Sequence, residues 1–187
     1  MNSKTIILIG GCLAAGKSAF SKRLSQKLGV LCINKDYVKE ILCDTLGFSS
    51  RTENKRFSET TFHIMRHVAE QSMKSGLPII LESNFRPADG EKLLPLIQKY
   101  GYIPITIMLT GNLQVLFQRY TKRLENRHPA HKSGAFRNFE SYAAHCQLLL
   151  GFDVGSKKIT VDTTNFDNID FDGILLQMKG WFNEKYT

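Results

Sequence analysis

One segment near the start of the chain constrains the fold more than any other, the glycine-rich run Gly11-Cys12-Leu13-Ala14-Ala15-Gly16-Lys17-Ser18. An apolar run, residues 5–9, precedes it, and a helical pattern, residues 17–28, follows it directly. The segment matches Gly-x4-Gly-Lys-Ser, the pattern of a loop whose backbone N–H groups surround a phosphate at the start of a helix. Because strand, loop and helix come in the required order, an accidental glycine turn is the weaker interpretation.

Apolar runs and helical patterns alternate along the rest of the chain. Continuous Val, Ile and Leu runs predict buried strands at 5–9, 30–33, 77–81, 103–109 and 158–161. Helical patterns lie between them at 17–28, 36–46, about 57–73 and 88–100, with another starting at Leu113. This alternation predicts an α/β fold with a mostly parallel sheet. With 187 residues and no repeat or linker, we expect a single domain spanning 1–187.

The phosphate-binding loop has residues with separate expected roles. We expect Lys17 to reach the outer phosphates of a nucleotide and to assist catalysis, and Ser18 to place its hydroxyl on Mg²⁺. The remaining loop residues are expected to bind the nucleotide, namely Gly11, Cys12, Leu13, Ala14, Ala15 and Gly16. The sequence therefore predicts ATP and Mg²⁺ as ligands.

Polar side chains follow two of the expected strands. Asp36 comes just after the second strand, and Glu82 ends the third. Ligands of open parallel sheets bind at the carboxyl ends of the strands, so both carboxylates are expected to face the loop. Glu82 is interpreted as a Mg²⁺ anchor, with a solvated carboxylate as the alternative. Asn84 and Arg86 are expected to bind substrate, although Arg86 is equally compatible with an exposed loop cation.

Asp36 admits three roles. A carboxylate at this place can accept the proton of an attacking hydroxyl, and so act in catalysis and in acceptor binding, or it can steady the Mg²⁺ shell. Aspartate is also a preferred N-cap, so Asp36 is also compatible with simply capping the helix that follows. These roles are not mutually exclusive.

A basic segment, residues 119–137, is dense in arginine, lysine and histidine and offers little to a core. We expect it to be a surface loop that forms a lid. Arg119, Arg123 and Arg127 recur every four residues and would share one face of a helix. Arg119 and Arg123 are the expected catalytic arginines, because arginines stabilise charge on a transferred phosphate, and Arg127 is expected to bind the nucleotide. A solvated stripe that pairs with carboxylates such as Glu125 is the alternative.

Composition excludes several classes of protein. The four cysteines contain no Cys-x-x-Cys pair, which speaks against zinc fingers and disulfide scaffolds and favours a reducing, cytoplasmic location. No apolar run approaches the roughly 18 residues of a membrane span. The net charge of +8 suits anionic ligands, whether nucleotides, phosphorylated small molecules or nucleic acid.

With these residues in place, the chain resembles the nucleoside-monophosphate-kinase-like branch of the P-loop kinases. This branch includes gluconate and shikimate kinases, chloramphenicol phosphotransferase, zeta-toxin-like sugar-nucleotide kinases and the kinase half of polynucleotide kinases. The resemblance covers nearly the whole chain and rests on Gly11 to Ser18, Asp36, Glu82, the basic run 119–131 and the late run Val161-Asp162-Thr163-Thr164. The chain departs from the pattern at Glu82, where many relatives have aspartate, and at Ala130, where some relatives have glycine.

The resemblance implies a three-layer P-loop NTPase fold, with a five-stranded parallel sheet in the order 2-3-1-4-5 between helices. It also implies that Thr163, Thr164 and Asn165 lie along the adenine of ATP. The expected activity is transfer of the γ-phosphate of Mg-ATP to a hydroxyl of a small molecule. The alternative is a polynucleotide 5′-hydroxyl kinase or a nucleic-acid-associated ATPase, which the basic charge favours and the lack of an RNA-binding signature disfavours. A regulatory GTPase is disfavoured because Asn34-Lys35-Asp36 lacks the spacer residue of Asn-Lys-x-Asp.

Overall fold

A computed structural model of the chain describes residues 4–132 and 134–183. The five strands are β1 (Thr5–Gly11), β2 (Cys32–Asn34), β3 (Ile79–Glu82), β4 (Ile103–Thr110) and β5 (Lys157–Asp162). The α-helices are α1 (Lys17–Leu28), α2 (Lys35–Leu46), α3 (Arg51–Lys74), α4 (Pro87–Tyr100), α5 (Leu113–Leu124), α6 (Phe139–Leu150) and α7 (Phe171–Asn183). Two short 3₁₀ turns complete the set, η1 (Pro129–His131) and η2 (Phe166–Asn168). Residues 1–3, 133 and 184–187 of the predicted domain lie outside the described residues. Of these, Ser133 belongs to the predicted lid.

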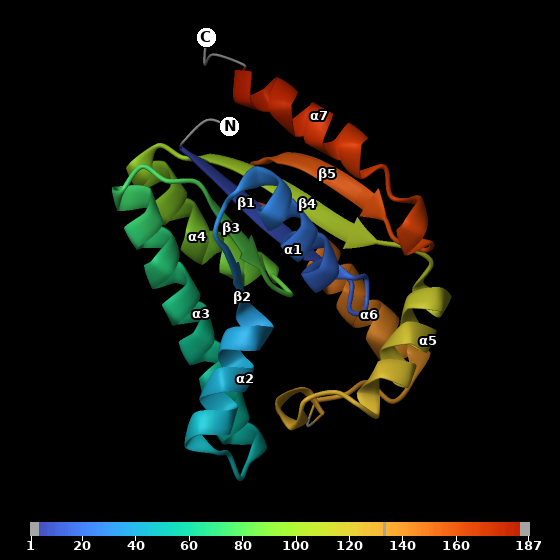
Figure 1. Cartoon of the computed structure of the whole chain (residues 1–187). Coiled ribbons are helices and arrows are strands. Elements are labelled where there is room, and N and C mark those ends of the chain that lie inside the picture. The colour runs from blue at the N-terminus through green and yellow to red at the C-terminus, as the bar shows by residue number, and fades with distance from the viewer. Residues whose placement is uncertain (1–3, 133, 184–187) are drawn as a thin grey trace.

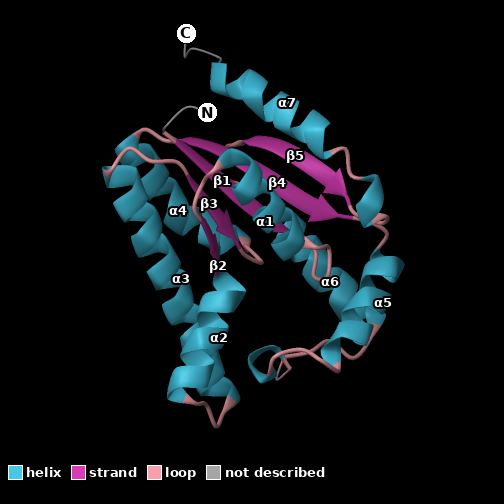
Figure 2. Cartoon of the chain, in the orientation of Figure 1, coloured by secondary structure: helices cyan, strands magenta, loops and turns pink. Residues whose placement is uncertain are grey.

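The strands form one sheet in the order β2-β3-β1-β4-β5 (Figures 1 and 2). Every pairing in it is parallel. The α/β class, the strand order and the layers expected from the sequence are therefore confirmed. Because β1 lies in the middle of the sheet, the loop that follows it lies at the centre of the carboxyl edge. Within the described ranges, no helix is long and apolar enough to cross a membrane.

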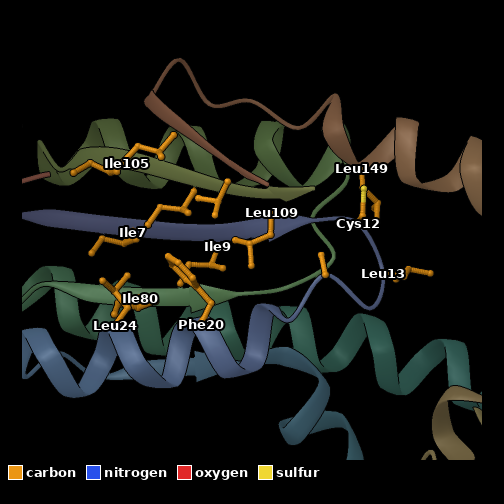
Figure 3. Packing of buried hydrophobic residues seen from close by; sticks show 14 of the residues in the cluster. Ile7, Ile9, Cys12, Leu13, Phe20, Leu24, Ile80, Ile105, Leu109 and Leu149 are labelled. Carbon is orange, nitrogen blue, oxygen red and sulfur yellow. The ribbon is translucent and has the colours of Figure 1, made fainter. Parts of the chain in front are cut away.

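Both faces of the sheet are covered by helices, so β1 is buried along its whole length. Ile7 and Ile9 belong to a cluster with apolar side chains of α1, α5, α6 and α7. Ile6 and Leu8 point to the other face and pack with α3 and α4. Figure 3 shows Phe20 of α1 directed at the first of these faces. This burial explains the continuous apolar runs, since alternating polar residues would be buried on one face or the other.

Several boundaries differ from the predicted ones. The second strand starts at Cys32 rather than at residue 30, and α2 begins at Lys35. The long helix α3 begins at Arg51, where the Ser50 side chain accepts a hydrogen bond from Glu53 N–H. The helices α6 and α7 lie outside the predicted set. In α6 the buried positions are Tyr142, Cys146 and Leu149, and the basic segment before it obscures this pattern in the sequence.

The predicted lid is only partly a surface loop. Its first residues, 119–124, are the last two turns of α5. Tyr120 and Ala130 are both buried, which corrects the expectation that this segment offers little to a core. The helix ends at Leu124, so Arg127 lies beyond it and cannot share a helical face with Arg119 and Arg123.

Candidate active site

The phosphate-binding loop joins β1 to α1 in a conformation that needs its two glycines. Gly11 has φ 120°, and a Cβ there would collide with the Leu109 carbonyl oxygen of β4. Gly16 has φ 79° and ψ 19°, and a Cβ there would enter the Phe166 ring. Positive φ and close packing both exclude a side chain at these positions. The loop is therefore held by β4 on one side and by the η2 segment on the other.

Cys12 continues the pairing of β1 with β4. Its backbone N–H donates to the Leu109 carbonyl oxygen over 2.8 Å, and its side chain is buried beside α6 (Figure 3). Cys12 is one of the predicted nucleotide-binding residues, and its backbone N–H is thus already hydrogen-bonded to β4. The next residue, Leu13, accepts a hydrogen bond through its carbonyl from the Tyr142 hydroxyl of α6, over 2.7 Å. The loop is thereby attached to the helix that follows the basic segment.

Lys17 is buried at the start of α1. Its ammonium donates to the carbonyl oxygens of Gly11 and Cys12, over 3.1 and 2.7 Å. Burial lowers the pKa of Lys17, while the nearby charges of Glu82 and Asp36 act in the opposite direction. A desolvated ammonium inside a ring of loop atoms binds an anion strongly, because no water competes with it.

Ser18, Glu82 and Asn34 converge from three elements. Asn34 ends β2 and is paired in register with Glu82 at the end of β3. The Ser18 hydroxyl donates to Glu82 Oε2 over 3.2 Å, and the Asn34 amide donates both to that oxygen and, over 3.1 Å, to Ser18 Oγ. The prediction that Glu82 faces the loop is in keeping with this geometry.

The Glu82 carboxyl is buried, and this burial raises its pKa to about 7. The charge of Asp36 adds to the rise, whereas Lys17 and the hydrogen bonds oppose it. Its side chain and the Ser18 hydroxyl offer hard oxygen ligands at one point of the carboxyl edge of the sheet. A divalent cation with its own waters replaces a proton on such a carboxylate favourably, so the residues present fit Mg²⁺.

Asn34 has a second role that the sequence did not reveal. Its side-chain oxygen accepts from Tyr37 N–H over 3.0 Å, so Asn34 is the N-cap of α2. The hypothesis that Asp36 caps this helix is therefore wrong, because Asp36 lies inside the first turn. Asparagine is a preferred N-cap, and this preference was the only local signal for Asn34.

Asp36 instead forms an ion pair with the basic segment. Its Oδ2 atom lies 3.3 Å from Nη2 of Arg127. Burial lowers the pKa of Arg127, and Asp36 opposes this shift. The structure thus brings Arg127 to Asp36 on α2, whereas the sequence predicted that Arg127 binds the nucleotide.

The rest of this segment docks on α2 and α3 through η1. His128 Nε2 lies 2.8 Å from Asp44 Oδ1, and His131 Nε2 lies 2.9 Å from Glu40 Oε1. The carbonyl oxygen of Ala130 accepts hydrogen bonds from the side chains of Lys39 and Asn54, over 3.1 and 2.8 Å respectively. With Asp36 included, three carboxylates spaced four residues apart on α2 each pair with one side chain of the segment. We call these three pairs the lid latch.

Arg119 and Arg123 have different surroundings. The Arg119 guanidinium donates to the carbonyl oxygens of Thr163 and Thr164, over 2.7 and 2.6 Å. Arg123 is exposed and has no hydrogen bond or ion pair among residues 4–132 and 134–183. Arg119 thus supports the loop after β5 and Arg127 pairs with Asp36, so of these three arginines Arg123 has the uncommitted guanidinium.

The loop after β5 is fixed to the neighbouring elements by its threonines. The Thr163 hydroxyl donates to the Thr110 carbonyl over 2.8 Å, and the Thr164 hydroxyl accepts from Asn112 N–H over 2.7 Å. Asn165 caps η2 through its side-chain oxygen. Phe166 was not predicted, yet it packs against Gly16 and brings this loop to the phosphate-binding loop.

Asn84 and Arg86 follow β3. The Asn84 side-chain oxygen is buried and has no hydrogen-bond partner in the described part of the chain. Arg86 is the residue before α4, and its backbone N–H donates to Asp89 Oδ2 over 2.9 Å. The Arg86 side chain is exposed, so its guanidinium can contact a ligand.

Comparison with known proteins agrees with this fold. The family model of the AAA domain matches residues 6–149. A candidate kinase from Chloroflexus aurantiacus has a similar structure with a TM-score of 0.77, at 28% identity over 96% of both chains. No curated protein gives a significant match.

Two more distant structures share the fold. A gluconokinase from Sinorhizobium meliloti has a TM-score of 0.54 at 13% identity, over 98% of this chain and all of its own. A shikimate kinase from Bacteroides thetaiotaomicron has a TM-score of 0.60 at 13% identity, over 96% of this chain and 99% of its own. The chain therefore belongs to the AAA domain family and has the P-loop fold of the nucleoside-monophosphate-kinase-like kinases.

Proposed function

We propose that the protein transfers the γ-phosphate of Mg-ATP to a hydroxyl group of a small-molecule acceptor. The observation that carries the proposal is the convergence of Lys17, Ser18 and Glu82 at the carboxyl edge of the sheet, with Asp36 on the adjoining helix. An ammonium, a hydroxyl–carboxylate pair and a second carboxylate are the groups that phosphoryl transfer to an alcohol uses.

Each residue has a separate task in this reaction. The loop N–H groups and Lys17 would bind the phosphates, and Ser18 and Glu82 would hold Mg²⁺, which supplies charge neutralisation at the phosphates when bound. Asp36 would accept the proton of the acceptor hydroxyl as its oxygen attacks phosphorus. Arg123, on the last turns of α5, would stabilise charge on the transferred group.

The acceptor side lies between α2 and the basic segment, where Arg127 pairs with Asp36. An acceptor that reaches Asp36 would have to exchange contacts with this guanidinium. The nucleotide side lies towards Thr163 and Thr164, which Arg119 fixes by its two hydrogen bonds. ADP release during incubation with small hydroxylated acceptors is the assay that tests the proposal.

Asp36→Asn provides a specific test of the base. Asparagine keeps the size of the side chain and can still accept a hydrogen bond from Arg127, but it is not a proton acceptor. We expect transfer to the acceptor to fall by about 10²- to 10⁴-fold, with binding of Mg-ATP retained. Asp172→Asn, which changes a carboxylate of α7, is the control and should keep the wild-type rate. A wild-type rate in Asp36→Asn would show that another group takes the proton.

The net charge of +8 favours a second candidate, a polynucleotide 5′-hydroxyl kinase. Binding through phosphate contacts weakens steeply with salt. An oligonucleotide that binds in a salt-dependent way and accepts phosphate at its 5′ end would favour this candidate. Phosphorylation of a small alcohol without any effect of the oligonucleotide would favour the first.

A further inference from the structure

Two lysines from different helices lie at one aromatic ring beside the candidate active site. The ring belongs to Phe62 of α3 and is almost fully buried. Lys35 Nζ lies 5.9 Å from its centroid, and Lys92 Nζ lies 5.6 Å from it. Lys35 is the first residue of α2 and follows Asn34, which contacts Ser18 and Glu82. Lys35 therefore follows the carboxyl end of β2 directly, and Lys92 reaches the same ring from α4, the helix that follows β3.

This group carries more positive than negative charge. Burial lowers the pKa of Lys35 most strongly, and the charges of Arg86 and Lys92 lower it further. Two carboxylates oppose this shift, Asp89 and Asp36. Asp36 also pairs with Arg127, so its charge is shared, whereas Asp89 accepts only the neutral Arg86 backbone N–H. Three cations, Lys35, Arg86 and Lys92, thus face two carboxylates, and a bound anion would offset the excess positive charge.

An unpaired acceptor atom lies in the same strand-end segment. Asn84 stands between Glu82 and Arg86 in the chain, and its buried side-chain oxygen has no hydrogen-bond partner among the described residues. A buried carbonyl oxygen without a donor costs about 1–3 kcal/mol. A ligand with a hydroxyl or amine group would supply the missing donor.

We propose that Lys35, Arg86 and Lys92 bind an anionic group, a carboxylate or a phosphate, of the phosphoryl acceptor. The oxygen of Asn84 accepts a hydrogen bond from a hydroxyl or amine of the same molecule. This proposal rests on the proposed phosphotransfer function and defines its acceptor as a small hydroxylated acid. Such an acceptor presents its hydroxyl to Asp36 while its anionic end lies towards α4.

Binding and turnover of matched compounds test this acceptor class. The panel consists of neutral polyols, the monocarboxylates of the same carbon skeletons and their monophosphates, each measured with ADP or ATP and Mg²⁺. For the wild type, we expect at least one acid to raise the melting temperature more than its neutral counterpart and to have a kcat/KM at least about 10-fold higher. The carboxylate and phosphate series show which anion the site prefers.

Lys35→Met and Lys92→Met remove the charges and keep most of the side-chain length. For the preferred acid, each change should raise the KM about 10-fold, and the effect should fall on the acceptor rather than on ATP. Lys92→Arg should restore most of the affinity, because it returns the charge. Lys99→Met is the matched control, since Lys99 also lies over a ring, that of Tyr100, near the end of α4.

The outcomes separate this proposal from the proposed function. If the acids of the panel bind no better than the polyols, or if Lys35→Met and Lys92→Met bind them as the wild type does, the anion site is wrong. Transfer to neutral alcohols that depends on Asp36 would then leave the phosphotransferase intact. Anion binding that requires these lysines, without transfer of phosphate to any bound acid, would instead contradict the phosphotransfer reaction.

Discussion

Lys17 shows how a single side chain depends on its surroundings. Its ammonium is buried and contacts two carbonyl oxygens of its own loop, so it is positioned by atoms that are adjacent in the sequence. Local positioning explains why the place of Lys17 in the loop could be predicted from the sequence. Asn34 is the opposite case, because its contacts with Ser18 and Glu82 join residues 16 and 48 positions apart. No local pattern encodes these contacts.

For Lys17→Ala we expect an intact fold and the loss of most nucleotide-dependent stabilisation. A nucleotide at 100 times its dissociation constant stabilises the folded protein by about 2.7 kcal/mol. Thermal unfolding with and without Mg-ATP measures this effect. Lys22→Ala, an exposed lysine of the same helix, should keep the wild-type shift. Equal shifts in the wild type and in Lys17→Ala would contradict the assignment of the loop.

Glu82→Gln tests the expected metal role. Glutamine keeps the shape of the side chain but removes the charge that attracts Mg²⁺. We expect the Mg²⁺ concentration needed for half-maximal ATP binding to rise by about 10- to 100-fold. Titration of Mg²⁺ at constant ATP measures it, with the exposed Glu91→Gln as control. An unchanged Mg²⁺ requirement would leave Glu82 as a structural carboxylate that only orients Ser18.

At the scale of elements, the sequence predicted the strands of the sheet better than the helices α6 and α7 and the segment that docks on α2. The strands were found because burial on both faces makes them continuously apolar. The segment 125–132 is held instead by single polar contacts, of which the carbonyl oxygen of Ala130 makes two. Such contacts have no periodicity, so the sequence predicted a lid but not the surface of α2 on which it lies.

The lid latch gives a prediction about pH. Burial lowers the pKa of His131, as do the charges of Arg127 and Lys39, whereas Asp36 and the hydrogen bond with Glu40 oppose the shift. The unfolded chain therefore takes up this proton first as the pH falls. The stabilisation from neutral His131 is present above the unfolded pKa of about 6.5 and is lost as the pH falls below it, with a slope of at most about 1.4 kcal/mol per pH unit.

In His131→Gln this part of the pH dependence should disappear, because glutamine can donate to Glu40 without titrating. Urea unfolding at pH values from about 7.5 to about 5, on both sides of the ordinary histidine pKa, measures the difference from the wild type. His63→Gln, at an exposed position of α3, serves as control. A wild-type pH profile in His131→Gln would show that this pair does not affect folding.

For the whole molecule, the two clusters on either side of the sheet predict where substitutions affect stability. Leu24 is fully buried between α1 and the sheet, while Leu176 of α7 is 71% exposed. We expect Leu24→Ala to lower the free energy of unfolding by about 2–5 kcal/mol, because it leaves a cavity. Leu176→Ala should change it by less than about 0.5 kcal/mol. Denaturant unfolding measures both, and similar losses would contradict the core described above.

The basic segment is attached to loops at the carboxyl edge of the sheet, both at its start and through the helix that follows it. Its first residue, Arg119 of α5, contacts the loop after β5, and Tyr142 of α6 contacts the phosphate-binding loop. Between these points, the lid latch attaches it to α2. By thermodynamic linkage, a nucleotide that binds one arrangement of the segment more tightly must favour that arrangement by the same free energy. Under the proposed function, acceptor and nucleotide would therefore change each other's affinity through this one stretch of chain, by the same factor in both directions.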